Sequence, residues 1–128
     1  MTLSRDEPAL RWLRSFERAV AARDFDAGEA LFAEDVLAYG TLSPVMHGRR
    51  SLIDQQWKPV WTATRSFHFT ELDSVTKRKD GWVLAARWAS ESIGGAQRQG
   101  RCTLVLDGSP PRCVHSHFSM VPSDGARL

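Results

Sequence analysis

The sequence of 128 residues is poor in features that would point directly to a reaction. It contains neither a glycine-rich phosphate loop nor a Gly-x-Ser-x-Gly nucleophile motif. The longest basic run is Lys77–Lys79 and the net charge is +2, so nothing indicates nucleic-acid binding. No apolar stretch has the length of a membrane span, and the N-terminal residues do not form a signal segment. We therefore expect a cytoplasmic protein with no nucleic-acid or membrane partner.

Cysteine is also scarce, with only Cys102 and Cys113. They fall in consecutive expected strands joined by a turn around Gly108–Pro111. Antiparallel pairing across that turn places Cys102 near His117 and Cys113 near Leu106. The two thiols then do not face each other, so we expect no disulfide. Neither thiol lies at a charged helix start, so we expect no catalytic cysteine.

What the chain does contain is typical of a globular domain. Hydrophobic residues make up 42% and charged residues 25% of the sequence. This length suits a single domain with one core, and we assign residues 1–128 to it.

Helical periodicity dominates the first half. Apolar residues at helical spacing predict a helix from Asp6 to Arg23, with Ser4 and Glu7 as its capping box. Further helices are expected over residues 25–33 and 48–63, and Pro59 should kink or end the last of these. A short apolar run, residues 36–39, indicates an edge strand.

From Ser66 onward the apolar residues recur with the period of two that is typical of strands. Four strands are expected, at residues 67–77, 82–93, 97–107 and 112–121. Their turns are too short for parallel crossovers, which predicts an antiparallel meander. Three N-terminal helices packed on such a sheet form an α+β fold. Because two of these strands are partly apolar on both faces, we also predict a homodimer formed through the sheet.

The last strand carries two histidines, His115 and His117, on one face. An imidazole can exchange a proton near neutral pH, so these side chains are candidate catalytic groups lining a cavity. The alternative is a pair of hydrogen-bonded structural histidines. A metal site would need a third ligand, and the sequence supplies none nearby, so we expect neither a metal nor another cofactor.

Four other polar side chains are candidates. Tyr39, the only tyrosine, can donate to a ligand oxygen or simply pack. Glu91 is the best candidate for an inward carboxylate base. Arg87 and Arg101 can bind a ligand carboxylate, or they can form ion pairs on an outer face.

Tryptophan is comparatively abundant, with five residues. Trp57 and Trp61 share one face of the expected third helix, and Trp88 lies on a strand. They are candidate walls of an apolar ligand cavity, or ordinary core residues.

The order of elements and four segments together resemble the nuclear transport factor two-like superfamily, and within it the SnoaL-like and ketosteroid-isomerase-like proteins. The segments are Phe16–Gly40, His47–Trp57, Gly100–Leu106 and Val114–Pro122. The last of these is also similar to the end of the association domain of calcium/calmodulin-dependent kinase II. The resemblance implies a strongly curved, cystatin-like cone and a homodimer.

Within this superfamily, fold alone does not determine function. The first hypothesis is a protein that binds a small hydrophobic ligand, or a cofactor-free isomerase, dehydratase or cyclase that transfers a proton on a hydrophobic carbonyl compound. In that case His115, His117, Tyr39 and Glu91 would act on the ligand. The alternative is a non-catalytic binding or oligomerisation module. The sequence leaves open whether the protein is an enzyme.

Overall fold

A computed structural model describes residues 5–41 and 45–121 of the chain. Their elements follow one another in the order α1 (Glu7–Ala22), α2 (Phe25–Glu29), β1 (Phe32–Tyr39), β2 (Met46–His47), α3 (Arg49–Leu52), η1 (Ile53–Trp57), α4 (Lys58–Thr62), β3 (Thr64–Arg78), β4 (Gly81–Ser92), β5 (Gln97–Asp107) and β6 (Arg112–Met120). The fold is α+β, as the sequence predicts. No helix among these residues is long and apolar enough to cross a bilayer.

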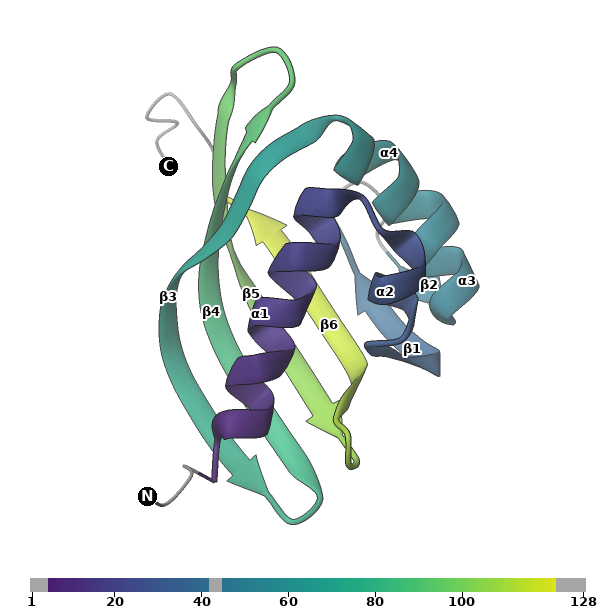
Figure 1. Ribbon diagram of the computed structural model, residues 1–128, viewed down its shortest axis with the longest axis vertical. Coiled ribbons are helices and arrows are strands. Elements are labelled where there is room, and N and C mark those ends of the chain that lie inside the picture. The colour runs from purple at the N-terminus through teal and green to yellow at the C-terminus, as the bar shows by residue number, and fades with distance from the viewer. Residues whose placement is uncertain (1–4, 42–44, 122–128) are drawn as a thin grey trace.

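The six strands form one curved sheet in the order β2-β1-β6-β5-β4-β3 (Figure 1). The predicted meander is confirmed, because β3, β4, β5 and β6 pair in sequence with antiparallel neighbours. The prediction of a wholly antiparallel sheet is wrong at one place, since β1 runs parallel to β6. Short turns force antiparallel pairing only between consecutive strands, and most of the chain separates these two.

Helix α1 lies across the concave side of the sheet, which curves around it (Figure 1). Its apolar stripe, which includes Leu13, Phe16 and Val20, is buried, and its bounds match the predicted helix to within a residue. The predicted capping residue Ser4 lies outside the described residues. At the other end Arg23 adopts a left-handed conformation and donates through its guanidinium to the carbonyl oxygens of Trp61 and Thr64, both at 3.0 Å. This bond pair joins the end of α1 to the point where α4 becomes β3.

The third predicted helix is a continuous helical run through α3, η1 and α4. Its middle segment, Ile53–Trp57, is a π-helix placed just before Pro59. Proline has no amide proton to donate back along the helix, and a wider turn at this point lets the chain pass it without ending. The second predicted helix is shorter than expected, because the chain enters β1 at Phe32.

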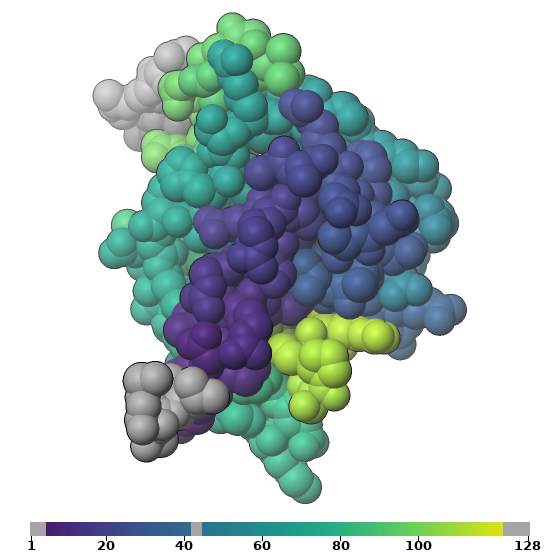
Figure 2. All heavy atoms as spheres, in the orientation of Figure 1, coloured from purple at the N-terminus to yellow at the C-terminus, as the bar shows by residue number. Residues whose placement is uncertain are grey.

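The two faces of the sheet differ in burial. The inner face, which is the side facing α1, carries fully buried residues such as Leu84, Leu104 and Leu106, and Phe16 from α1 packs into it. Each such leucine contributes about 1.5–3 kcal/mol through burial. From the helix side, α1 fills the front of the molecule between β3 and the helices that follow it (Figure 2). The opposite, outer face of the sheet is covered by no helix of the described chain (Figure 1).

Candidate functional site

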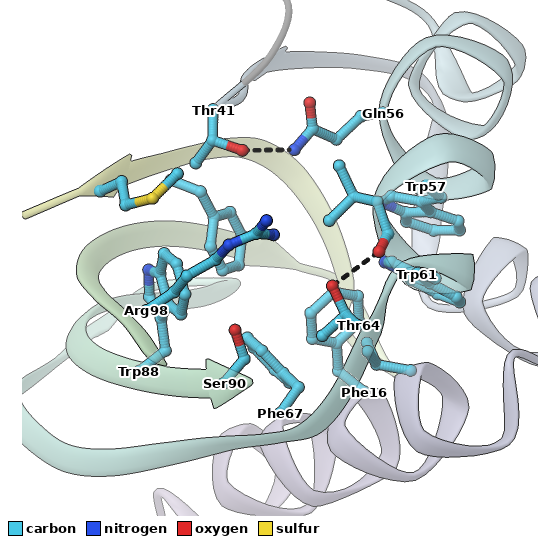
Figure 3. A pocket seen from close by; sticks show the side chains of 14 residues that line it. Phe16, Thr41, Gln56, Trp57, Trp61, Thr64, Phe67, Trp88, Ser90 and Arg98 are labelled. Carbon is cyan, nitrogen blue, oxygen red and sulfur yellow. Dashed lines mark hydrogen bonds between the residues drawn. The ribbon is translucent and has the colours of Figure 1, made fainter. Parts of the chain in front are cut away.

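A cavity of about 80 Å³ opens between the helices and one end of the sheet. Its walls come from α1, the η1–α4 run, the start of β3, the end of β4, the start of β5 and the end of β6 (Figure 3). Most of the lining is aromatic or aliphatic, and it comprises Phe16, Val20, Thr41, Gln56, Trp57, Val60, Trp61, Thr64, Phe67, Trp88, Ser90, Arg98, Phe118 and Met120.

Stacked rings form one wall. Trp57 and Trp61 lie with ring centroids 4.5 Å apart and planes 17° apart, and Phe25 stacks on Trp61 at 5.3 Å. Gly28 explains how α2 approaches this wall. A Cβ atom there would lie 2.8 Å from Trp61 and 2.9 Å from Trp57, closer than carbon atoms can pack. Glycine therefore weakens α2 but lets the helix fix the indole rings in place.

Two polar side chains of the lining bond within the protein. The Gln56 amide, 9% exposed, donates from Nε2 to the Thr41 hydroxyl at 3.0 Å. The Thr64 hydroxyl donates to the Val60 carbonyl oxygen at 2.6 Å, on the last turn of α4. Both bonds are drawn in Figure 3. These groups hold the mouth and one edge of the cavity together.

Two other polar side chains of the lining make no hydrogen bond or ion pair with the described residues. Ser90 on β4 and Arg98 on β5 are direct cross-strand partners, and both side chains point into the cavity in Figure 3. Ser90 is 6% exposed and Arg98 is half-buried. Within residues 5–41 and 45–121, neither side chain has a hydrogen bond or an ion pair, and the Ser90 hydroxyl is not sealed from solvent. The cavity thus combines apolar walls with one arginine and one serine side chain that have no partner among the described residues.

Three predicted catalytic residues come together elsewhere. Tyr39, His115 and His117 lie on β1 and β6, with the phenol ring 5.2 Å from one imidazole and 5.4 Å from the other, both edge-on. His115 Nδ1 lies 2.8 Å from the Leu37 carbonyl oxygen, and His117 is exposed. None of the three lines the cavity, because they occupy the outer face of the sheet. Whether they act on a ligand stays a prediction.

A β-bulge explains this placement. Cys113 pairs with Leu106, as predicted, but His115 pairs with Val105, so Val114 is an extra residue in β6. Beyond the bulge the strand changes face: Cys113 and Ser116, three residues apart, are both buried. The prediction that Cys102 pairs near His117 is therefore one residue off, because its partner is Phe118. Without Val114 the histidines would share the inner face with Cys113.

The remaining polar candidates also face outward. Glu91 accepts from Arg65 at 2.6 Å and from Gln97 at 2.8 Å, and these bonds lower the pKa of its carboxyl group. Glu91 is therefore an ion-paired surface carboxylate, and the prediction of an inward base is wrong. Arg87 makes two bonds to Asp73, at 3.0 and 2.8 Å, which raise its pKa.

Arg101 is exposed and, like Arg87, does not line the cavity. The predicted wall residues Trp57, Trp61 and Trp88 do line it. Sequence reasoning missed Ser90 and Arg98. Their signal was present, since both fall on the same alternation as the buried residues of their own strands.

Metal ligands do not gather in the described chain. Among residues 5–41 and 45–121, no group of three or more His, Cys, Asp or Glu side chains is placed to hold an ion. Both cysteines are unpaired and buried.

Comparison with known proteins identifies the fold. Residues 12–107 match the model of the SnoaL-like domain. A cystatin-like protein of unknown function from Nostoc punctiforme superposes with a TM-score of 0.77 at 13% identity, covering 96% of this chain and 97% of that one. A candidate dehydratase of the NTF2-like family from Streptomyces avermitilis gives 0.76 at 17% identity, covering 91% and 97%.

A candidate calcium/calmodulin-dependent kinase II association domain from Thiobacillus denitrificans gives a TM-score of 0.70 at 22% identity, covering 87% of this chain and 93% of that one. At such identities the superpositions show a shared fold and nothing finer. No protein of curated function matches the sequence. The predicted relationship to the nuclear transport factor two-like superfamily is confirmed.

Proposed function

We propose that this chain, which belongs to the family of SnoaL-like domains, is a small-molecule-binding protein whose ligand enters the cavity beside the stacked indoles. One observation supports this most directly. The cavity is open, aromatic-walled, and contains two polar side chains, Ser90 and Arg98, that no described residue engages. Binding sites for small molecules have this composition, with apolar walls and a few convergent polar groups.

The size of the cavity limits the ligand. Its volume of about 80 Å³ is below the roughly 150 Å³ that holds a benzene molecule in an engineered protein core. Because the cavity is open, part of a ligand can remain in the mouth. We therefore propose a ligand with one ring or a short branched chain, and a fused polycyclic compound does not fit these walls as they stand.

Binding is favoured over proton transfer by the chemistry of the lining. Among the described lining residues there is no carboxylate, imidazole or phenol. Arg98 and Ser90 can donate hydrogen bonds to a carbonyl oxygen, but neither is suited to remove a proton at neutral pH. An isomerase, dehydratase or cyclase reaction in this cavity would need a base from another source.

The test is a binding screen with single-ring aromatic and short aliphatic compounds, read by thermal unfolding and by protein NMR. A ligand at a hundred times its dissociation constant stabilises the folded state by about 2.7 kcal/mol. The blocking variant is Val60→Phe, which places a ring in the cavity. Its matched control is Val45→Phe, at an exposed position that is 46% accessible. Binding that survives in Val60→Phe, or shifts confined to residues of the outer face, would contradict the proposal.

We further propose a homodimer in which the outer faces of two sheets meet. That face carries half-buried apolar side chains, including Val83, Ala85 and Val105, that no described helix covers. Ala85→Glu should shift the protein toward monomers in light scattering over a concentration series, while Ala21→Glu on α1 should not. A parent protein that is monomeric at high concentration would rule the dimer out.

A cytoplasmic location is also proposed. Cys102 and Cys113 are not joined in a disulfide, and proteins without disulfides are typical of the reducing cytoplasm. Fractionation of cells expressing the chain checks this point, and recovery outside the cytoplasm would contradict it.

A further inference from the structure

We propose that Ser90 and Arg98 form a carboxylate receptor, and that the ligand is a small aromatic acid with a single ring. This inference rests on the proposed function, because it assigns the ligand class of the same cavity. The apolar walls alone favour a ligand of suitable size and shape. The receptor additionally requires that the ligand carry a negative charge.

The geometry begins with strand pairing. Ser90 and Arg98 are register partners in the antiparallel β4–β5 pair, so their Cβ atoms stand side by side, about 4.5–5.5 Å apart. Both side chains therefore reach the same part of the cavity (Figure 3). The guanidinium offers a planar fork of N–H donors, and the hydroxyl adds one more. A carboxylate, with two oxygens in one plane, is the anion that this set of donors matches.

The same sheet provides an internal comparison. On the outer face, Arg87 finds a carboxylate in Asp73 and binds it through two nitrogens, at 3.0 and 2.8 Å. Arg98 has no such partner among the described residues, although it is more enclosed than Arg87. A guanidinium beside apolar rings gives up hydration without a compensating anion, which is unfavourable unless a ligand supplies one.

The other side chains of the lining determine which kind of ligand body can bind beside the carboxylate. The rings of Phe67 and Trp88 lie 6.0 Å apart next to the receptor, and the Trp57–Trp61 stack forms the facing wall. Aromatic walls favour a flat ring, through edge-to-face and offset contacts. A phosphate group would bring more oxygens and a second charge than one guanidinium and one hydroxyl can satisfy, so the receptor favours a carboxylate.

The decisive experiment titrates the full chain with benzoate and phenylacetate, and with the neutral analogues benzamide and benzyl alcohol. We expect the acids to bind about ten to a hundred times more tightly than the neutral compounds, the range that charge-assisted hydrogen bonds provide. Arg98→Gln should remove this preference, and Ser90→Ala should weaken benzoate about three- to tenfold. Arg101→Gln, on the same strand but on the outer face, should leave benzoate binding unchanged.

The outcomes separate the two proposals. If benzamide binds as tightly as benzoate, or Arg98→Gln keeps full benzoate affinity, the carboxylate receptor is wrong while cavity binding stands. If none of the four compounds binds the parent, the aromatic-acid receptor is wrong, and cavity binding fails as well only if the short aliphatic compounds of the wider screen also do not bind. Comparing benzoate with benzamide on the unaltered protein decides the charge requirement even if a variant does not fold.

Discussion

Charged side chains lie on both faces of the sheet, but their surroundings differ. On the outer face, Arg87 is neutralised by Asp73, and Glu91 by Arg65. On the inner face, Arg98 stands among aromatic rings with no described partner. We infer from this difference that a charged strand residue is the better candidate for a ligand contact when its surroundings are apolar and no described residue pairs with its charge. A charged residue on a solvent-exposed face usually forms an ordinary ion pair.

The largest expected difference between the faces is in thiol reactivity. Burial raises the pKa of Cys102 from 9.0 to about 12, which lowers its thiolate fraction near pH 8 about a thousandfold. Burial raises the pKa of Cys113 as well. Native protein should therefore react very slowly with iodoacetamide. In the monomer, a cysteine introduced by Thr103→Cys, one residue along β5 but on the outer face, should react at the rate of an exposed thiol, and it should react more slowly where the proposed dimer covers that face.

Mass spectrometry of labelled protein measures both rates, and the urea-unfolded chain serves as the control in which all thiols react. Rapid labelling of Cys102 in the native state would show that the inner face opens far more often than its burial implies.

Next in size is the effect of core truncation. Leu104→Ala removes a side chain that is 0% exposed and should destabilise the fold by about 2–5 kcal/mol. Thr103→Ala, its neighbour on the outer face, should change stability by about 0.5 kcal/mol or less. Urea unfolding compares the two in the Ala85→Glu background, in which the proposed dimer is disrupted. Equal losses of stability there would contradict the difference in burial between the two faces.

A smaller effect is expected at Gly100, on the inner face of β5. A Cβ atom there would overlap the backbone oxygen of Ser119 and lie 2.6 Å from the Trp88 ring. Gly100→Ala should therefore destabilise the protein by about 1–3 kcal/mol and shift Trp88 against the cavity. Gly94→Ala, where the nearest atom would be 3.9 Å away, is the control. Thermal unfolding measures the loss of stability, and tryptophan fluorescence reports the shift of Trp88. Equal melting temperatures for Gly100→Ala and Gly94→Ala would contradict the predicted steric clash at Gly100.

The smallest effect concerns pH. Hydrogen bonds from Arg65 and Gln97 lower the folded-state pKa of Glu91 below its ordinary value of 4.5. A carboxyl group with a lowered pKa stabilises the folded state above its ordinary value, and this contribution is lost as the pH falls through the folded-state pKa. Glu91→Gln should therefore make stability slightly less dependent on pH below about 4.5. Melting temperatures from pH 6 to pH 3 test this, and identical profiles for parent and variant would contradict it.

Most of the fold was predictable because it follows from local periodicity. The alternation in β4 and β5 and the turn at Gly94-Gly95 determined the meander and its register. The parallel contact between β1 and β6 was not predictable in this way, because it joins segments far apart in the sequence. Pro59 predicted that the third helix would be kinked or would end. The sequence did not predict that the helix would instead continue through a π-helical turn.

The residues of the candidate site were harder to predict than the fold, because one extra residue in β6 changes which side chains face the cavity. Val114 shifts β6 by a single position and places His115 and His117 on the outer face. No turn signal or glycine marks that bulge in the sequence. Arg98 was within reach of sequence reasoning, since it shares its alternation with the buried Cys102 and Leu104. Arg87 was a misleading candidate because its strand face also carries the apolar Val83 and Ala85, although that face is the outer one.

The stacked pair Trp57 and Trp61 has an optical consequence. Two indole rings 4.5 Å apart, with planes at 17°, couple their electronic transitions, and coupled transitions in a chiral setting produce a circular-dichroism couplet. The pair forms one wall of the cavity, so a guest molecule that separates or turns the rings changes the couplet directly. If the proposed ligand binds here, the couplet would report its occupancy without a label, and the close approach of Gly28 holds the two rings in place.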